Sequence, residues 1–386
     1  MKDKVWKAVS IAIILIFVCS TFANVHATAT QLATPPSIHI GTGPDFLAYD
    51  SGKGEIFVTD AISTVYVISD STNTVVATIS SIAYPYGVAY NSGKGEVFVL
   101  TETGTVAVIS DSTNAVVANI TVGNTGSLQE GIAYDSGKGE IFVANIIDNT
   151  VSVISDSTNA VVETINVGQY PLALAYDSGK GEIFVANQGS SSVSVISDSN
   201  NQVVATITGS ISGPEGVAYD PAKGEIFVSD YPAASFSVIS DKNNAVTTLG
   251  LGIAGAVEGL GNPHNVAFDT GTGQAFVNCN NAAVNIISDK NNAVVASFPP
   301  INGANILVTG FAYDSGKGEM FIGGNNVVYY LSDSSSPSAS PTSSPSPTSA
   351  SPSPTVPEFG SAALIIVVAA MVVATCAVAI KIKKRK

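Results

Sequence analysis

The chain has 386 residues, of which 45% are apolar, 12% are charged and 35 are glycine, a composition typical of a turn-rich β protein. Eight of the 16 basic residues lie at the two chain ends, and residues 37–333 contain eight lysines, no arginine and 28 acidic residues, a net charge of about −20. Nucleic acid is therefore a poor partner, because phosphate binding requires clustered Lys and Arg side chains, whereas cations, glycans and proteins suit this charge.

The N-terminus has the layout of a secretory signal peptide. Three lysines precede an apolar run centred on Ile11 to Val18, and small residues follow up to Val25-His26-Ala27. We predict a signal peptide over residues 1–27 and a short leader over residues 28–36. An uncleaved anchor is the alternative, although the apolar run is short for a bilayer span.

Residues 37–333 are dominated by one repeated string, Ala-Tyr-Asp-Ser-Gly-Lys-Gly-Glu-Ile-Phe-Val. Its third position recurs every 41 to 49 residues, at Asp50, Asn91, Asp135, Asp177, Asp220, Asp269 and Asp314. Periods of this length mark the four-stranded blades of a β-propeller, and seven copies predict seven blades. The glycines of the string supply a turn between the first two strands, and these Gly-Lys pairs lack the context of a phosphate-binding loop.

The two ends of the repeat region predict how the ring closes. The seventh unit stops after its third strand, near Asp333, and Ile38-His39-Ile40-Gly41 matches the fourth-strand endings of other units. We therefore predict an all-β, seven-bladed propeller whose last blade is completed by the N-terminal strand, which removes the open sheet edges.

Several residue types recur because of the fold. Seven phenylalanines at one equivalent position are expected to pack between blades, and a row of aspartates after the third strands is expected to cap turns: Phe57, Phe98, Phe142, Phe184, Phe227, Phe276 and Phe321, and Asp70, Asp111, Asp156, Asp198, Asp241 and Asp289. Cys279 is the one cysteine of the propeller, so we expect no disulfide there and a small buried side chain at a strand end.

The segments Ile183-Phe184-Val185-Ala186-Asn187 and Val193-Ser194-Val195-Ile196-Ser197-Asp198 resemble the YVTN β-propeller repeat. The resemblance covers about residues 37–333. The turn Asp-Ser-Gly-Lys-Gly departs from the family's usual Pro-Asp-Gly. Membership would imply a cell-surface or surface-layer protein of archaea. The same kind of propeller also resembles lactonases and other enzymes, so the fold leaves the function open.

The residues that begin the first strands are the best candidates for a ligand site at the mouth of the central channel. Alignment of the seven units places there Asp45, Tyr86, Glu130, Leu172, Glu215, His264 and Thr309. The main expectation is a solvated rim with neither metal nor cofactor. The alternative is a Ca²⁺ site, for which Asp45, Glu130 and Glu215 are the candidate ligands, because Ca²⁺ prefers oxygen donors.

One pair in this ring has a catalytic alternative. Asn262-Pro263-His264-Asn265 resembles the histidine-bearing start of a strand in propeller lyases, and Glu215 lies one blade away. His264 and Glu215 could then exchange protons as a general acid and base. The main expectation is nevertheless that no residue is catalytic and that His39, on the closing strand, is structural.

Residues 334–356 are nearly all Ser, Pro, Thr and Ala, which predicts an extended stalk that cannot form a packed core. Its hydroxyl groups suit O-glycosylation. Asn119-Ile120-Thr121, within the propeller, is an N-glycosylation sequon at Asn119.

The last segment, residues 357–386, predicts attachment to a membrane. Pro357-Glu358-Phe359-Gly360 resembles the PEF-type C-terminal sorting signal (PEF-CTERM) of archaeal surface proteins, and residues 361–380 contain no charge and are long enough for one transmembrane helix. The basic residues 381–386 would remain in the cytoplasm. The resemblance implies cleavage at the motif and attachment of a lipid; a permanent single-pass anchor is the alternative.

Together these features predict a propeller on the extracellular face of the cell membrane that binds extracellular protein or glycan, as an adhesion or surface-layer module. Similar blades offer multivalent contacts. An extracellular hydrolase or lyase of the lactonase type, acting at the channel mouth, is the alternative, and a coat subunit without a small ligand is a third interpretation.

Overall fold

The computed structural model describes residues 30–31, 35–41, 43–124, 131–231, 233, 235–250, 263–279, 283–298 and 310–333. The chain divides into two compact units, Met1–Ser338 and Ala339–Lys386, and every described residue belongs to the first. The predicted signal peptide, stalk, sorting motif and transmembrane helix lie outside the described residues. Within the described ranges, no helix is long and apolar enough to cross a membrane.

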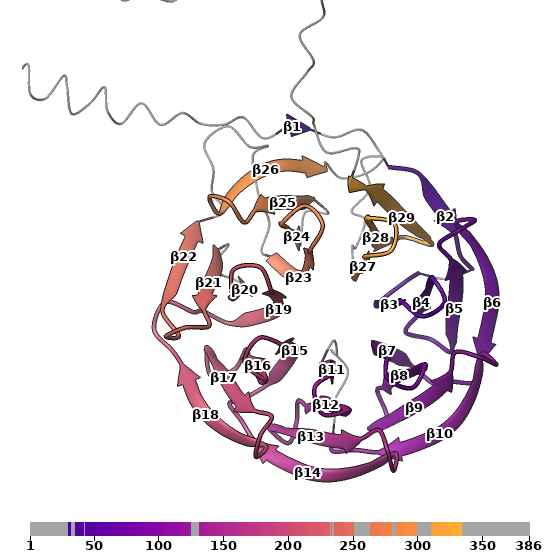
Figure 1. The fold of residues 1–386 in the computed structure, drawn as a ribbon, viewed down its shortest axis with the longest axis horizontal. Helices are drawn as coiled ribbons and strands as arrows, with labels where there is room; N and C mark the ends of the chain where they lie inside the picture. The colour runs from indigo at the N-terminus through magenta and orange to yellow at the C-terminus, as the bar shows by residue number, and fades with distance from the viewer. Residues whose placement is uncertain are drawn as a thin grey trace, which may run out of the picture. The chain divides into compact units, whose positions relative to one another are not determined.

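Seven antiparallel sheets are arranged around a central axis, with one strand of each sheet innermost (Figure 1). Blade 1 contains β3 (Leu47–Asp50), β4 (Glu55–Thr59), β5 (Thr64–Ser69) and β6 (Thr74–Ser80). Blade 2 contains β7 (Pro85–Asn91), β8 (Glu96–Thr101), β9 (Thr105–Ser110) and β10 (Ala115–Thr121). Blade 3 contains β11 (Ile132–Asp135), β12 (Glu140–Asn145), β13 (Thr150–Ser155) and β14 (Ala160–Asn166).

The remaining blades follow the same order from the axis outward. Blade 4 contains β15 (Pro171–Asp177), β16 (Glu182–Asn187), β17 (Ser192–Ser197) and β18 (Gln202–Ile207). Blade 5 contains β19 (Pro214–Asp220), β20 (Glu225–Asp230), β21 (Ser235–Ser240) and β22 (Val246–Gly250). Blade 6 contains β23 (Pro263–Asp269), β24 (Gln274–Cys279), β25 (Val284–Ser288) and β26 (Ala293–Phe298). Blade 7 contains β27 (Phe311–Asp314), β28 (Glu319–Gly324), β29 (Val327–Ser332) and β2 (Ser37–His39).

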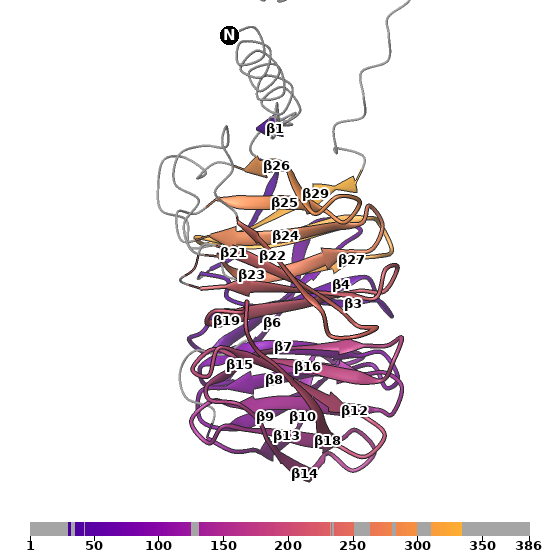
Figure 2. The same ribbon diagram turned by 90° about the vertical axis from the view of Figure 1, so that its left-hand side faces the viewer.

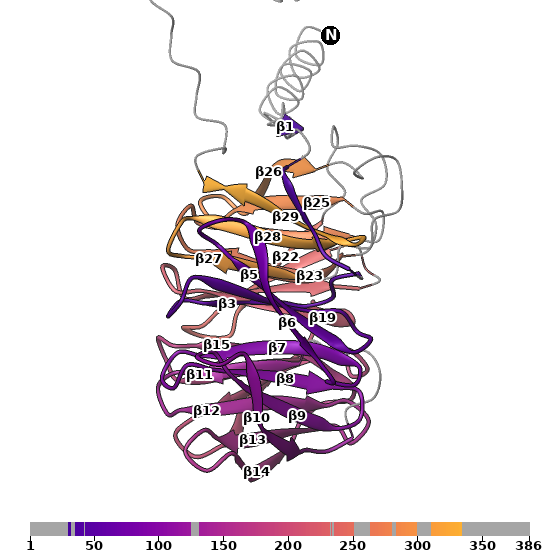
Figure 3. The ribbon, with the colours of Figure 1, turned by 90° about the vertical axis from the view of Figure 1, so that its right-hand side faces the viewer.

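The N-terminal strand closes the ring, as predicted. Strand β2 pairs antiparallel with β29, placing Ile38 opposite Val328, and the Ile40 amide donates to the Asn326 carbonyl (3.1 Å). Blade 7 thereby becomes the neighbour of blade 1, and the indigo and yellow strands lie together in Figure 3. A short strand, β1 (Thr30–Gln31), adds to the outer edge of blade 6 by parallel pairing with β26 (Figure 2).

The core consists of layers between neighbouring blades. The second and third strands are apolar on both faces because each blade packs against two others, and the apolar clusters each join residues of adjacent blades. The phenylalanine row is confirmed as core: all seven rings are at most 2% exposed. Burial of such a side chain contributes about 1.5–3 kcal/mol, so this row is a repeated source of blade cohesion.

Candidate functional site at the channel mouth

The first strand of each blade runs between two faces of the ring. Asp45, Tyr86, Leu172, Glu215 and His264 stand at its start, and we call their side of the ring the mouth face. The Ala-Tyr-Asp turn stands at its end, and we call that side the junction face. Because strands alternate in direction, the loops after the second strands lie on the mouth face and the turns after the third strands lie on the junction face.

On the junction face, the repeated string holds neighbouring blades together. Asp50 Oδ1 accepts hydrogen bonds from the Gly52 and Lys53 amides (2.8 and 3.1 Å), which closes the turn. The Lys53 ammonium donates to the Asp111 carbonyl of blade 2 and lies 4.0 Å from the Asp111 carboxylate. We call this arrangement the inter-blade clamp; it recurs with Lys94, Lys138 and Lys317.

A tyrosine and a second carboxylate complete the clamps of Lys53 and Lys317. The Tyr90 hydroxyl lies against Gly52 of the preceding blade, and burial together with the Asp50 carboxylate raises the Tyr90 pKa. Burial and the nearby Asp314 likewise raise the pKa of Asp70. The clamps of Lys53 and Lys317 thus each gather two acidic groups, a phenol and an ammonium at a blade boundary.

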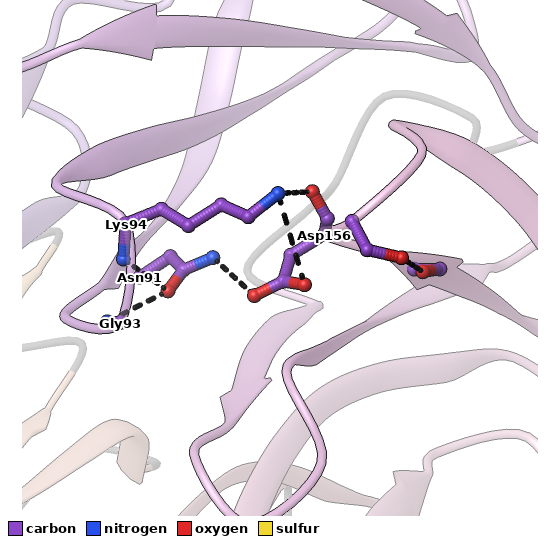
Figure 4. Close-up of polar contacts among 6 residues, drawn as sticks. Asn91, Gly93, Lys94 and Asp156 are labelled. Atoms are coloured by element: carbon purple, nitrogen blue, oxygen red, sulfur yellow. Dashed lines mark hydrogen bonds and ion pairs between the residues drawn. The ribbon is translucent and has the colours of Figure 1, made fainter.

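Aspartates such as Asp156, which were expected to cap turns, also contact the preceding blade. Figure 4 shows the boundary between blades 2 and 3, where Asn91 replaces the usual aspartate and donates from Nδ2 to Asp156 Oδ2 (3.0 Å). Lys94 approaches the same residue, its ammonium 4.0 Å from the carboxylate. These aspartates are therefore structural parts of the ring.

Side chains from all seven first strands fill the central channel. The cavity that they line holds about 190 Å³, and each blade contributes one large apolar side chain: Leu47, Val88, Ile132, Leu174, Val217, Val266 and Phe311. A drug-sized ligand needs about 300–1,000 Å³. A ligand larger than this cavity therefore has to bind at the mouth rather than inside the channel.

The first group of mouth residues comes from blades 4, 5 and 6. Nδ1 of His264 is hydrogen-bonded to Glu215 Oε2, while Gln188 Nε2 donates to Glu215 Oε1 (2.5 Å). The Tyr231 ring stacks on the His264 imidazole, with centroids 5.0 Å apart. Three successive blades therefore hold one carboxylate in a fixed orientation at the mouth.

The second group comes from blades 1 and 2. Asp45 is half-buried, and burial together with the negative charge of Asp60 raises its pKa to about 7. Burial and the nearby Glu102 raise the pKa of Tyr86. Asp60 is itself fixed by the amides of its own loop, including that of Ser63 (2.8 Å).

The structure brings together some of the predicted ring residues and separates others. His264 and Glu215 are paired, as the acid/base hypothesis requires, whereas Asp45 belongs to the other group. Glu130 and Thr309 lie outside the described residues. In the part of the chain that is described, no three His, Cys, Asp or Glu side chains are grouped to hold a metal. Calcium binding through Asp45, Glu130 and Glu215 stays a prediction.

Sequence reasoning missed the loop residues that complete these groups. Glu102, Gln188 and Tyr231 occupy one equivalent position, four residues after the buried phenylalanine of their blades. This position varies between blades while the preceding strand is nearly constant. That contrast between a variable position and a nearly constant strand could have marked these residues as candidates for the site. Their contacts with neighbouring blades, however, are visible only in the closed ring.

Two other predicted residues lie away from the mouth. Cys279 is confirmed as a buried free cysteine, 4% exposed. Asn119 is exposed on β10, beside a groove of about 720 Å³ that Thr78, Ser81 and Thr103 help to line. The sequon is therefore accessible at the outer rim of blade 2.

Comparisons with known proteins support the fold and leave the function open. No family model matches the sequence, and no curated protein matches it. The structure resembles a chain of Kuenenia stuttgartiensis Hydrazine Synthase, with a TM-score of 0.64 and 16% identity over 80% of this chain and 99% of that chain. Identity this low shows a shared propeller fold, and a propeller serves as a scaffold for binding or for catalysis.

Proposed function

We propose that this chain is a binding and adhesion module of the YVTN propeller type, attached to the extracellular face of the cell membrane, and that its mouth face contacts the partner. The observation that carries the proposal is the difference between the two faces. The junction face repeats the same Asp, Tyr and Lys contacts, which hold blades together. The described mouth residues at the start of the first strands vary between blades, as Asp45, Tyr86, Leu172, Glu215 and His264 show, and a purely structural role does not require that variety.

The charge distribution supports this choice of face. All eight lysines of the propeller lie in turns after first or third strands, which belong to the junction face. The mouth face carries Asp45, Asp60, Glu102 and Glu215. Such a surface favours neutral or cationic partners and repels anionic ones.

Attachment to the outer face of the membrane is supported by the sequence. A signal peptide over residues 1–27, a stalk over residues 334–356 and an apolar segment over residues 361–380 would place the propeller outside the cell. A stalked module of this kind is suited to contacts with envelope polymers, coat proteins or another cell.

Binding of the full-length chain to envelopes of the cells that express it tests the proposal. The mouth variant combines Glu215→Gln with His264→Ala, and its control, Val204→Ala, changes an exposed residue of the outer rim. We expect saturable binding that is weakened by the mouth variant and kept by the control. Equal binding of both variants, or no binding by the native chain, would contradict the proposal.

A second candidate function rests on the contact between Glu215 and His264. A carboxylate that orients an imidazole, itself stacked on Tyr231, is a geometry suited to general acid/base chemistry by a hydrolase or lyase. Turnover of small lactones by the native chain, abolished by Glu215→Gln, would support this alternative. Absence of turnover across a lactone and ester panel would remove it.

A further inference from the structure

Two tyrosines on the mouth face adopt a backbone conformation that tyrosine rarely takes. Tyr84 and Tyr170 both have φ of 50° and both precede a proline that starts a first strand. The equivalent residue in blade 5 is Gly213, with φ of 57°. Glycine adopts this left-handed conformation without steric cost, whereas a bulky side chain there is an outlier that calls for an explanation.

The backbone around the three residues is the same. The carbonyls of Tyr84, Tyr170 and Gly213 each accept a hydrogen bond from the loop after the second strand of their own blade (3.0–3.1 Å). The left-handed backbone at this position is therefore a feature of the fold that recurs in three blades. Glycine fulfils it in blade 5, whereas blades 2 and 4 have tyrosine there.

Burial does not explain the two tyrosine rings. Tyr84 is 50% exposed and Tyr170 is 51% exposed, so each leaves much of its apolar surface in solvent. The Tyr170 ring lies close to Gly189, where a Cβ would come within 2.3 Å of Cδ2, so the absence of a side chain at Gly189 leaves room for the ring. Each tyrosine thus presents an exposed aromatic ring next to a polar loop residue, Glu102 for Tyr84 and Gln188 for Tyr170.

We infer that Tyr84 and Tyr170 are stacking platforms for sugar rings of a neutral extracellular polysaccharide. This inference rests on the proposed function and names its ligand class. An aromatic face binds the apolar C–H face of a sugar. A neighbouring carboxylate can accept hydrogen bonds from the sugar hydroxyls, and a neighbouring side-chain amide can both donate to them and accept from them. The lack of lysine and arginine on the mouth face disfavours sulfated or phosphorylated polymers.

The spacing of the platforms suits a polymer with a repeating unit. Blades 2 and 4 present the same tyrosine at the same structural position, separated by one blade. Two weak sites that engage one chain together bind far more tightly than either site alone. A polysaccharide meets this condition because its sugars repeat along the chain.

The test uses the full-length chain and treated cell envelopes. Periodate oxidation destroys sugar rings, and protease digestion destroys surface proteins. We expect binding to survive protease and to be lost after periodate. Binding that survives periodate but not protease would overturn the saccharide inference and leave the proposed adhesion function standing. No binding to untreated envelopes would overturn both.

Substitutions at the two tyrosines separate a ligand role from a structural one. Tyr84→Gly and Tyr170→Gly should each weaken binding about fivefold, and the double variant more than about twentyfold, because stacking and bivalency are both lost. The thermal midpoint should not fall, because glycine suits the left-handed backbone. Tyr84→Phe, which keeps the ring, should retain most binding. Unchanged binding with a lowered midpoint in the glycine variants would show that the tyrosines are structural.

Discussion

At the scale of single residues, Asp45 shows how a half-buried carboxyl group at the mouth makes the stability of the folded protein depend on pH. Its pKa is raised from 3.8 to about 7 by burial and by Asp60. The stability linked to its proton is fully present below pH 3.8 and is lost as the pH rises through about 7, because the unfolded chain releases the proton first. Above pH 7, the folded protein carries an unfavourably placed carboxylate.

Asp45→Asn should therefore stabilise the protein near pH 8 and have little effect near pH 4. The full shift corresponds to at most about 4 kcal/mol, and solvent screening reduces the expected gain in unfolding free energy to about 1–2 kcal/mol. Urea unfolding of both proteins at the two pH values measures the difference. A difference that is independent of pH would show that Asp45 titrates normally.

Cys279 gives a second prediction at this scale. Burial raises the pKa of its thiol to about 11, and Asn285 Nδ2 donates to its sulfur (3.3 Å). Because thiolate is the reactive form, iodoacetamide should leave Cys279 unmodified in the folded chain and modify it after denaturation. Mass spectrometry of the Cys279 peptide distinguishes the states, and rapid modification of the native chain would contradict the assigned burial.

At the scale of elements, the inter-blade clamp differs between boundaries in a testable way. Blade 6 has Thr272 where the clamp lysine stands elsewhere, and its hydroxyl donates to Asp269 Oδ2 (2.5 Å) instead of contacting blade 7. The nearby Asp269 and Asp333 carboxylates thus lack the ammonium that Lys53 supplies at the boundary between blades 1 and 2.

Thr272→Lys should raise the unfolding free energy by about 0.5–1 kcal/mol, and Lys53→Thr should lower it by about 1 kcal/mol. The stability gained by Thr272→Lys is expected to be smaller than that lost by Lys53→Thr, because Thr272→Lys also removes the hydrogen bond to Asp269. Chemical denaturation of the two variants beside the native chain provides the measurement. If Thr272→Lys were destabilising, the clamp geometry of blade 1 would not transfer to blade 6.

The same elements show what the sequence could and could not predict. The number of blades and the buried phenylalanines were predictable because they recur with the period of the repeat. Ring closure was predictable because the seventh unit lacks a fourth strand and the N-terminal segment matches one. The contact between Lys53 and Asp111 was not predicted, because it joins different blades and no single repeat contains it. The mouth was predicted in part: alignment placed Glu215 beside His264, but Gln188 and Tyr231 come from loops whose neighbours depend on the closed ring.

At the scale of the whole molecule, charge predicts the pH dependence of stability. The propeller has many more acidic residues than lysines, and burial is the largest cause that raises the pKa of several of its carboxyl groups, among them Asp198 and Asp230. Raised pKa values in the folded state make stability fall as the pH rises. The thermal midpoint should therefore be higher near pH 5 than near pH 8, and calorimetry at both values would reveal the opposite trend if the shifts are wrong.

Ring closure gives the last prediction, because β2 pairs the N-terminal segment with the last blade. Ile38 is 6% exposed and packs in the layer between blades 7 and 1, while His39, the next residue on the strand, is exposed. Ile38→Asp would bury a charge in that layer and should cost more than about 3 kcal/mol, with faster proteolysis at blades 1 and 7. His39→Ala, on the opposite face of the strand, should change the unfolding free energy by less than about 0.5 kcal/mol. Equal effects of the two variants in thermal unfolding and limited proteolysis would mean that closure does not depend on this strand, and the ring would have to be held by contacts between blades alone.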